Sequence, residues 1–148
     1  MSDWDGFAGG LAEALSRLET RTVLVLVDAE RPTGGRYAAF VQYRDFLRAE
    51  VSASTSVPAG PPLPAQAEAA IGTMGWATPD PAGVPNWHID VPWPAPSARY
   101  LDLAGRTVAV LHDVFGFDSP DRLRYRAWID VTGERLSLPE LLVSPQPE

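Results

Sequence analysis

Apolar side chains recur every three or four residues in two parts of the chain, and this spacing predicts two amphipathic helices. In the first helix the apolar face consists of Trp4, Phe7, Leu11, Leu15 and Leu18. The second helix covers 97–115 and ends before Gly116, a residue type that commonly stops helices. Its stripe consists of Leu101, Ala104, Val108, Leu111 and Phe115. This stripe is the longest in the chain, so we expect the second helix to lie buried against a sheet.

Three strands are predicted between residues 22 and 54. The run 22–28 is short and rich in valine, which favours a buried strand over a helix. The segments 36–43 and 46–54 follow a Pro-Thr-Gly-Gly turn and form a hairpin if Arg44 and Asp45 make a two-residue turn. That turn sets which residues share a face. One face carries Ala38, Phe40, Leu47, Ala49 and Val51, and the other carries Tyr37, Val41, Tyr43, Arg48 and Glu50.

The middle of the chain combines a connector, a short helix and an edge strand. Residues 57–62 form a proline-rich connector, and a short helix then runs from Pro64 to a stop at Gly75. The segment 76–96 is rich in proline and tryptophan, which suits an edge strand and irregular loops. We expect packing in the core for Trp4, Trp76 and Trp87, whereas for Trp93 and Trp128 burial and exposure are equally plausible.

A last strand is predicted from alternation. Leu123, Tyr125, Ala127 and Ile129 alternate with Arg122, Arg124, Arg126 and Trp128. The resulting order, α-β-β-β-α-β-α-β, predicts an α+β fold in which helices pack on one face of an antiparallel sheet of about five strands. A length of 148 residues and 45% apolar content suit a single domain spanning 1–148, and we expect the tail after about residue 142 to be frayed.

Composition narrows the classes of function. With no cysteine, a disulfide, a thiolate nucleophile or a Cys-type zinc site is excluded. A net charge of −7 disfavours nucleic acid and anionic membranes as partners. The chain has no apolar run of membrane-spanning length, and its start lacks the pattern of a secretory signal, so we expect a cytoplasmic protein.

No catalytic motif occurs in the sequence. His88 and His112 are the only histidines, and neither stands in a metal-ligand spacing such as H-E-x-x-H. The glycines fit no phosphate-binding loop and no nucleophile elbow. Asp80, Asp90, Asp118 and Asp121 lie in or beside loops, where aspartate commonly closes turns. We therefore predict no catalysis, no bound metal and no cofactor.

The arginine-bearing face of the last strand is the candidate binding surface. An unpaired guanidinium is costly to bury, so the apolar set of this strand should face the helices and the arginines should face outward. If this strand lies beside the hairpin, the outward surface extends across it and comprises Tyr37, Val41, Tyr43, Arg48, Arg122, Arg124, Arg126 and Trp128. Arginine and aromatic residues are enriched at interface hot spots. The alternative is a solvated strand face that pairs with neighbouring acids.

The chain resembles the TY-Chap family, actinobacterial domains grouped with type III secretion chaperones and YbjN-like proteins. The resemblance spans residues 4–130 and is carried by Trp4 and Phe7, the hairpin segments 37–43 and 47–51, Gly75-Trp76, Pro85-Asn86-Trp87, 107–116 and 123–128. It implies a small α+β fold that binds unfolded or extended peptide segments, and the dimers of secretion chaperones imply a homodimer as one arrangement. The sequence departs from those chaperones in its proline-tryptophan segment and in the strand after the long helix.

These observations lead to two main hypotheses of function, beside a third, an uncharacterised hydrolase, which would require a polar cluster in a deep pocket. The first is a non-catalytic chaperone or adaptor that binds a protein or an extended peptide on an open sheet face. The alternative is an immunity or inhibitor protein, because a small acidic domain is suited to electrostatic steering toward the basic active site of a toxin.

Overall fold

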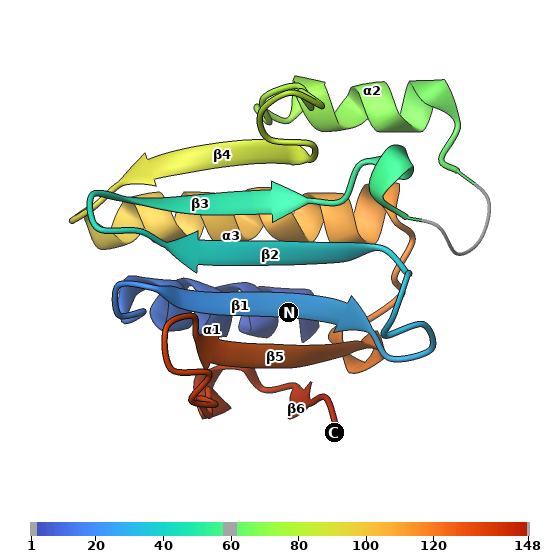
Figure 1. Cartoon of the computed structure of the whole chain (residues 1–148). Coiled ribbons are helices and arrows are strands. Elements are labelled where there is room, and N and C mark those ends of the chain that lie inside the picture. The colour runs from blue at the N-terminus through green and yellow to red at the C-terminus, as the bar shows by residue number, and fades with distance from the viewer. Residues whose placement is uncertain (1–2, 58–61, 148) are drawn as a thin grey trace.

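The computed structural model describes residues 3–57 and 62–147, which form a sheet with helices packed on one face (Figure 1). Within these ranges the sheet has six strands in the order β4-β3-β2-β1-β5-β6. Neighbouring strands are antiparallel except β5 and β6, which are parallel. The main elements are α1 (Asp3–Ser16), β1 (Thr22–Asp28), β2 (Tyr37–Gln42), β3 (Phe46–Val51), α2 (Ala65–Thr73), β4 (Trp87–Pro92), α3 (Ser97–Ala109), β5 (Leu123–Ile129) and β6 (Ser144–Pro145). The predicted α+β class and element order are confirmed, with β6 added.

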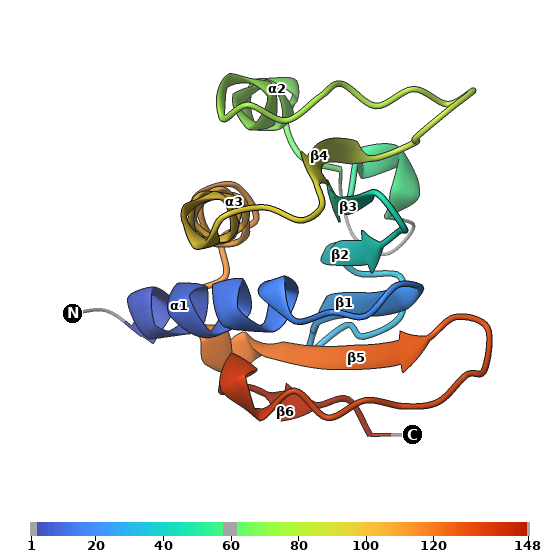
Figure 2. The same ribbon diagram turned by 90° about the vertical axis from the view of Figure 1, so that its left-hand side faces the viewer.

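The helices cover only one side of the sheet. Figure 2 shows the layers from the side, with α1 and α3 on one face and α2 beyond the β4 edge. The hairpin register places Ala38 opposite Val51 and Phe40 opposite Ala49, as the two-residue turn predicted. These side chains are fully buried beneath the helices together with Leu24, Leu26 and Leu47. The predicted fully buried first strand is wrong in one respect, because Val23 and Val25 lie on the uncovered face and are only half-buried.

The apolar face of α1 is buried as predicted. Trp4, Phe7, Leu11 and Leu15 pack into the core, and Leu18 joins them just beyond the end of the helix. The indole N–H of Trp4 donates to the backbone oxygen of Asp118 at 3.2 Å. This bond satisfies the polar end of the ring while its apolar body stays in the core.

The long helix is buried, but its stripe differs from the predicted one. Leu101 is 56% exposed, whereas Tyr100, Leu103, Ala104 and Thr107 are buried. The two stripes share Ala104, Leu111 and Phe115, and the buried face extends from them toward Leu103 and Thr107 rather than toward Leu101. Thr107 tolerates burial because its hydroxyl donates to the oxygen of Leu103 at 2.9 Å. After Ala109 the helix widens into a π-helical turn, Val110–Val114, and ends before Gly116, whose φ is +78°.

The proline-tryptophan segment contributes the edge strand β4 and two buried indoles. Trp76 and Trp87 are both buried, as expected, whereas Trp93 is 44% exposed. In α2 the carboxylate of Glu68 accepts hydrogen bonds from the Ser54 hydroxyl, the Ser54 amide at 3.1 Å and the Trp87 indole at 3.2 Å. Glu68 thus fastens α2 to the edge of the sheet. The predicted connector 57–62 lies mostly outside the described residues.

The C-terminal segment returns along the outer edge of β5. The amides of Leu136 and Gln146 donate to the oxygens of Ala127 and Tyr125 at 2.9 and 2.8 Å. Leu141 is fully buried beside α1, where Gly10 makes room for the chain: a Cβ at Gly10 would lie 1.9 Å from the oxygen of Glu140. The tail after residue 142, which we expected to be frayed, therefore carries β6 instead. Among the described residues, no helix is long and apolar enough to cross a membrane.

Candidate functional site

The uncovered face of the sheet gathers most of the predicted binding residues. This open face is turned toward the viewer in Figure 1, with α1 and α3 behind it. Strand pairing arranges its side chains in three rows. From β5 toward β4, one row contains Trp128, Val23, Val41, Arg48 and Asp90. The next contains Arg126, Val25, Ala39, Glu50 and His88, and the third contains Arg124, Val27 and Tyr37.

Positive and negative side chains lie on opposite sides of the open face. The β5 side carries the guanidinium groups of Arg124 and Arg126, and the centre is apolar, with valines and Ala39. The opposite side carries the carboxylates of Glu50 and Asp90. A ligand with one charged end and an apolar stretch would consequently have a preferred orientation on this surface.

Arg48, at the β3–β4 side of the open face, contacts Asp90 and two aromatic rings. Its Nε and Nη2 donate to the two carboxylate oxygens of Asp90 at 2.8 and 3.0 Å. The hydrogen bond with Asp90 raises the pKa of Arg48 above its ordinary value. The guanidinium carbon lies 5.3 Å from the ring centroid of Phe46 and 6.0 Å from that of Tyr43, and the two rings stack at 4.8 Å. Tyr43 therefore borders the open face from the turn rather than from a strand.

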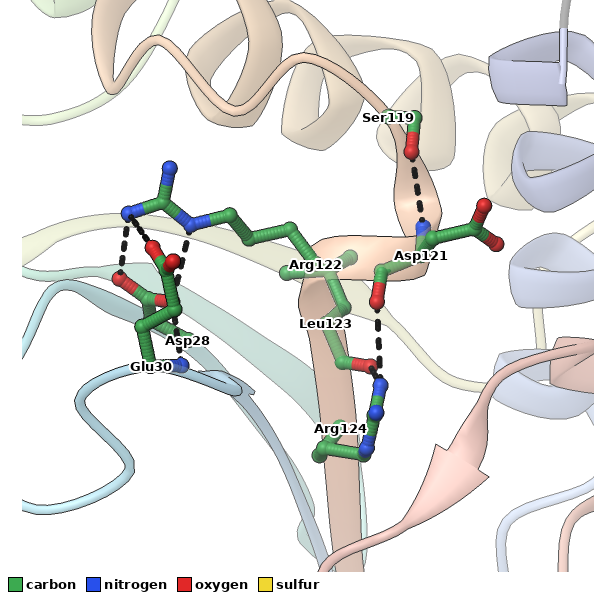
Figure 3. Close-up of polar contacts among 7 residues, drawn as sticks. All are labelled: Asp28, Glu30, Ser119, Asp121, Arg122, Leu123 and Arg124. Atoms are coloured by element: carbon green, nitrogen blue, oxygen red, sulfur yellow. Dashed lines mark hydrogen bonds and ion pairs between the residues drawn. The ribbon is translucent and has the colours of Figure 1, made fainter.

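Arg122 does not belong to the open face, so its predicted placement there is wrong. It ends a 3-10 turn, Pro120–Arg122, and the alternation of β5 begins only at Leu123. Its guanidinium reaches Asp28, Glu30 and the ring of Phe117, which lies in the core beneath the sheet. Figure 3 shows this side chain extending toward Asp28 and Glu30, away from Arg124.

Arg124 and Arg126 are held by neutral acceptors. Nη1 of Arg124 donates to the oxygens of Asp121 and Leu123 at 3.0 and 2.8 Å (Figure 3). Nη2 of Arg126 donates to the oxygen of Pro32 at 3.1 Å. Among the described residues, the ion pairs within 4.0 Å include neither arginine. Two positive charges are therefore left without a carboxylate from the described part of a protein whose net charge is −7.

Two cavities flank the β5 part of this face. The inner cavity, about 260 Å³, lies over β1 and β2 and is lined by Val25, Val27, Pro32, Tyr37 and Arg126, among others. The outer cavity, about 330 Å³, opens at the far edge of β5 and is lined by Arg126, Trp128, Leu136 and Pro145, among others. The sequence prediction missed Val25 and Val27, because a valine-rich run indicates a buried strand, and it missed Pro32, because a turn residue carries no sign of lying over the sheet.

The two histidines lie in different parts of the molecule. Nδ1 of His88 is 3.1 Å from the oxygen of Asn86 at the β4 edge, and Nδ1 of His112 is 2.8 Å from the carboxylate of Asp113 beyond α3. Within the part of the chain that the structure describes, no group of three or more His, Cys, Asp or Glu residues is placed to hold a metal ion.

Comparison with known proteins identifies one family. A family model described as TY-Chap3, "T3SS (YopN, CesT) and YbjN peptide-binding chaperone 3", matches residues 1–129. No curated protein matches the chain. No solved structure matches it either. The matched range covers the sheet from β1 to β5 and stops before the segment that forms β6.

Proposed function

The chain belongs to this family of peptide-binding chaperones, and from that premise we propose that it binds an extended segment of a partner protein on the open face of its sheet and acts without catalysis. The family description supplies the class of ligand. The location on the chain is our inference, and it rests on Arg124, Arg126 and Trp128 lying beside an apolar centre that no helix covers.

An extended peptide suits this surface for physical reasons. Every second side chain of an extended chain points the same way, so apolar side chains at alternate positions can lie on Val23, Val25 and Val41 together. The guanidinium groups of Arg124 and Arg126 can each donate hydrogen bonds to carboxylates of the ligand. Trp128 supplies a large, stiff apolar surface of the type that dominates binding energy at interfaces.

The test begins with peptide selection on the intact chain. A random-peptide display library is panned against the protein, and selected peptides are titrated by calorimetry. We expect Trp128→Ala and Arg124→Glu to weaken binding by about 1 kcal/mol or more, the scale of an interface hot spot. Arg17→Gln is the matched control, because Arg17 is exposed directly after α1, which lies on the other side of the sheet.

Circular dichroism establishes that each variant is folded. Unchanged affinity in both folded open-face variants would contradict the proposed location. If no peptide is selected and only a folded toxin domain binds, the inhibitor hypothesis replaces the chaperone hypothesis.

A further inference from the structure

Arg126 lies between the inner and the outer cavity and lines both of them. The inner cavity is on the β1 side of β5 and the outer one on its β6 side. The wall of the inner cavity is largely apolar, with Val25, Val27 and Pro32, whereas that of the outer cavity is mixed, with Leu136 and Pro145 beside Arg135 and Gln146. The guanidinium of Arg126 is thus placed between two recesses that each offer apolar side chains.

The guanidinium of Arg126 retains capacity for a ligand. A guanidinium has five N–H donors in a planar fork. Within the described residues, Nη2 donates to the oxygen of Pro32. No carboxylate of the described residues neutralises its charge. A carboxylate approaching from solvent can accept two parallel hydrogen bonds in this geometry.

The cavities fit apolar side chains in size and in spacing. A dry protein cavity of roughly 150 Å³ accepts a benzene ring, so about 260 and 330 Å³ are sufficient for one branched or aromatic side chain each. The inner cavity is lined from β2 to β5 and the outer one by β5 and the segment beyond it, which places their centres about two strand spacings, roughly 10 Å, apart. In an extended peptide, residues i and i+4 are about 13 Å apart and point the same way, as does residue i+2 between them.

We propose that this part of the open face recognises an acidic residue with an apolar residue two positions before it and another two positions after it. The proposal rests on the proposed function and gives the ligand its chemistry. The acidic side chain pairs with Arg126, and the two apolar side chains fill the inner and outer cavities. Charge complementarity favours such a segment over a basic one, because Arg124, on the same strand as Arg126, adds a second guanidinium that forms no ion pair within the described residues.

The test uses fluorescein-labelled Gly/Ser peptides that carry Leu-Ser-Glu-Ser-Leu. Matched peptides have Gln or Lys in place of Glu, and a fourth has Ser in place of both leucines. Anisotropy titrations of the full chain should show the Glu peptide binding roughly fivefold or more tightly than the Gln peptide, with the Lys and Ser peptides weaker still. Arg126→Glu should reverse the order of the Glu and Lys peptides. Arg126→Gln should remove the difference between them, and Arg17→Gln should leave the wild-type order unchanged.

The outcomes separate this proposal from the proposed function. Equal affinity of wild-type protein for the Glu and Lys peptides would overturn the motif. An unchanged order in Arg126→Glu and Arg126→Gln, with both variants folded by circular dichroism, would also overturn it. If library peptides without the motif bind and lose affinity in Trp128→Ala, the proposed function stands and the motif falls. If neither designed nor library peptides bind, both fall together.

Discussion

The guanidinium of Arg122 donates two hydrogen bonds to the carboxylate of Asp28, from Nε at 3.1 Å and from Nη2 at 3.2 Å, although the residues are 94 positions apart. The side chain of Asp28 is only 6% exposed, and that of Arg122 is 38% exposed. The hydrogen bond with Asp28 raises the pKa of Arg122. The pair joins the end of β1 to the start of β5.

Removal of the guanidinium should therefore destabilise the fold. In Arg122→Ala the buried carboxylate of Asp28 loses its charged partner, and we expect the free energy of unfolding to fall by about 1–3 kcal/mol. Solvent reaching Arg122 keeps the expected loss below that of a fully buried pair. Urea unfolding measures it. Arg17→Ala, which removes an exposed ion pair with Glu13, should cost about 0.5 kcal/mol or less, and equal losses in the two variants would contradict the prediction.

Two leucines of the long helix region form a matched pair for core packing. Leu111 is fully buried and Leu101 is 56% exposed. Leu111→Ala should lower the free energy of unfolding by roughly 2–5 kcal/mol, because it leaves a cavity beneath the sheet. Leu101→Ala should change it by about 0.5 kcal/mol or less. Thermal and urea unfolding of both variants check this difference, and similar losses would place the buried face of α3 elsewhere.

Neighbouring glycines of α1 should respond to alanine in opposite directions. An added Cβ at Gly9 meets nothing within 4 Å, so Gly9→Ala should raise the free energy of unfolding by roughly 0.5–1 kcal/mol through helix propensity. At Gly10 the same Cβ would collide with the oxygen of Glu140. Gly10→Ala should therefore destabilise the protein and speed hydrogen exchange at the amides of Leu136 and Gln146. Stabilisation by both substitutions would show that the C-terminal segment is not docked on α1.

The Glu68 cluster predicts a change of stability in acid. Burial raises the pKa of Glu68, but the hydrogen bonds from Ser54 and Trp87 lower it by more, so the pKa lies below its ordinary value of 4.5. A carboxylate of this kind stabilises the fold above the ordinary pKa, and the contribution disappears as the pH falls through the folded-state pKa. The stability advantage of wild type over Glu68→Gln should be constant near neutral pH and shrink below about pH 4.

The control for this prediction is Ser54→Ala, which removes the hydroxyl donor to Glu68 and leaves the two N–H donors in place. Its pH dependence should be weaker than that of wild type because the folded-state pKa moves back toward the ordinary value. Urea unfolding at several pH values measures both variants. An advantage of wild type that grows on acidification would reverse the sign and refute the role of Glu68.

Much of the sheet followed from local pattern. Alternation and turn chemistry were sufficient for the β2–β3 register, since a two-residue turn leaves one pairing in which Phe40 and Ala49 share the buried face. The placement of Arg124, Arg126 and Trp128 on the open face followed from the cost of burying a guanidinium. In each case, neighbours close in sequence carried the information.

What the sequence did not predict depended on distant partners. In the sequence Arg122 looks like the first residue of an alternating series. In the structure its guanidinium turns toward the core side, where it contacts Asp28 at the end of β1 and the ring of Phe117. The π-helical turn after Ala109 and the docking of Leu141 on α1 also arise from tertiary packing. The inner cavity beside Arg126 exists because the turn at Pro32 lies against β5, and no local sequence pattern predicts that contact.

The segment beyond residue 129 also determines how copies of the molecule can meet. It occupies the outer edge of β5 with hydrogen bonds from the amides of Leu136 and Gln146, so a strand of another molecule cannot pair with β5 there. The other border is the short strand β4, which is bridged at His88 by Ala77 and ends in Pro92, a residue without an N–H to offer. Lateral growth of the sheet into fibrils is thereby discouraged even at high concentration. Self-association, where it occurs, is left to surfaces formed by side chains.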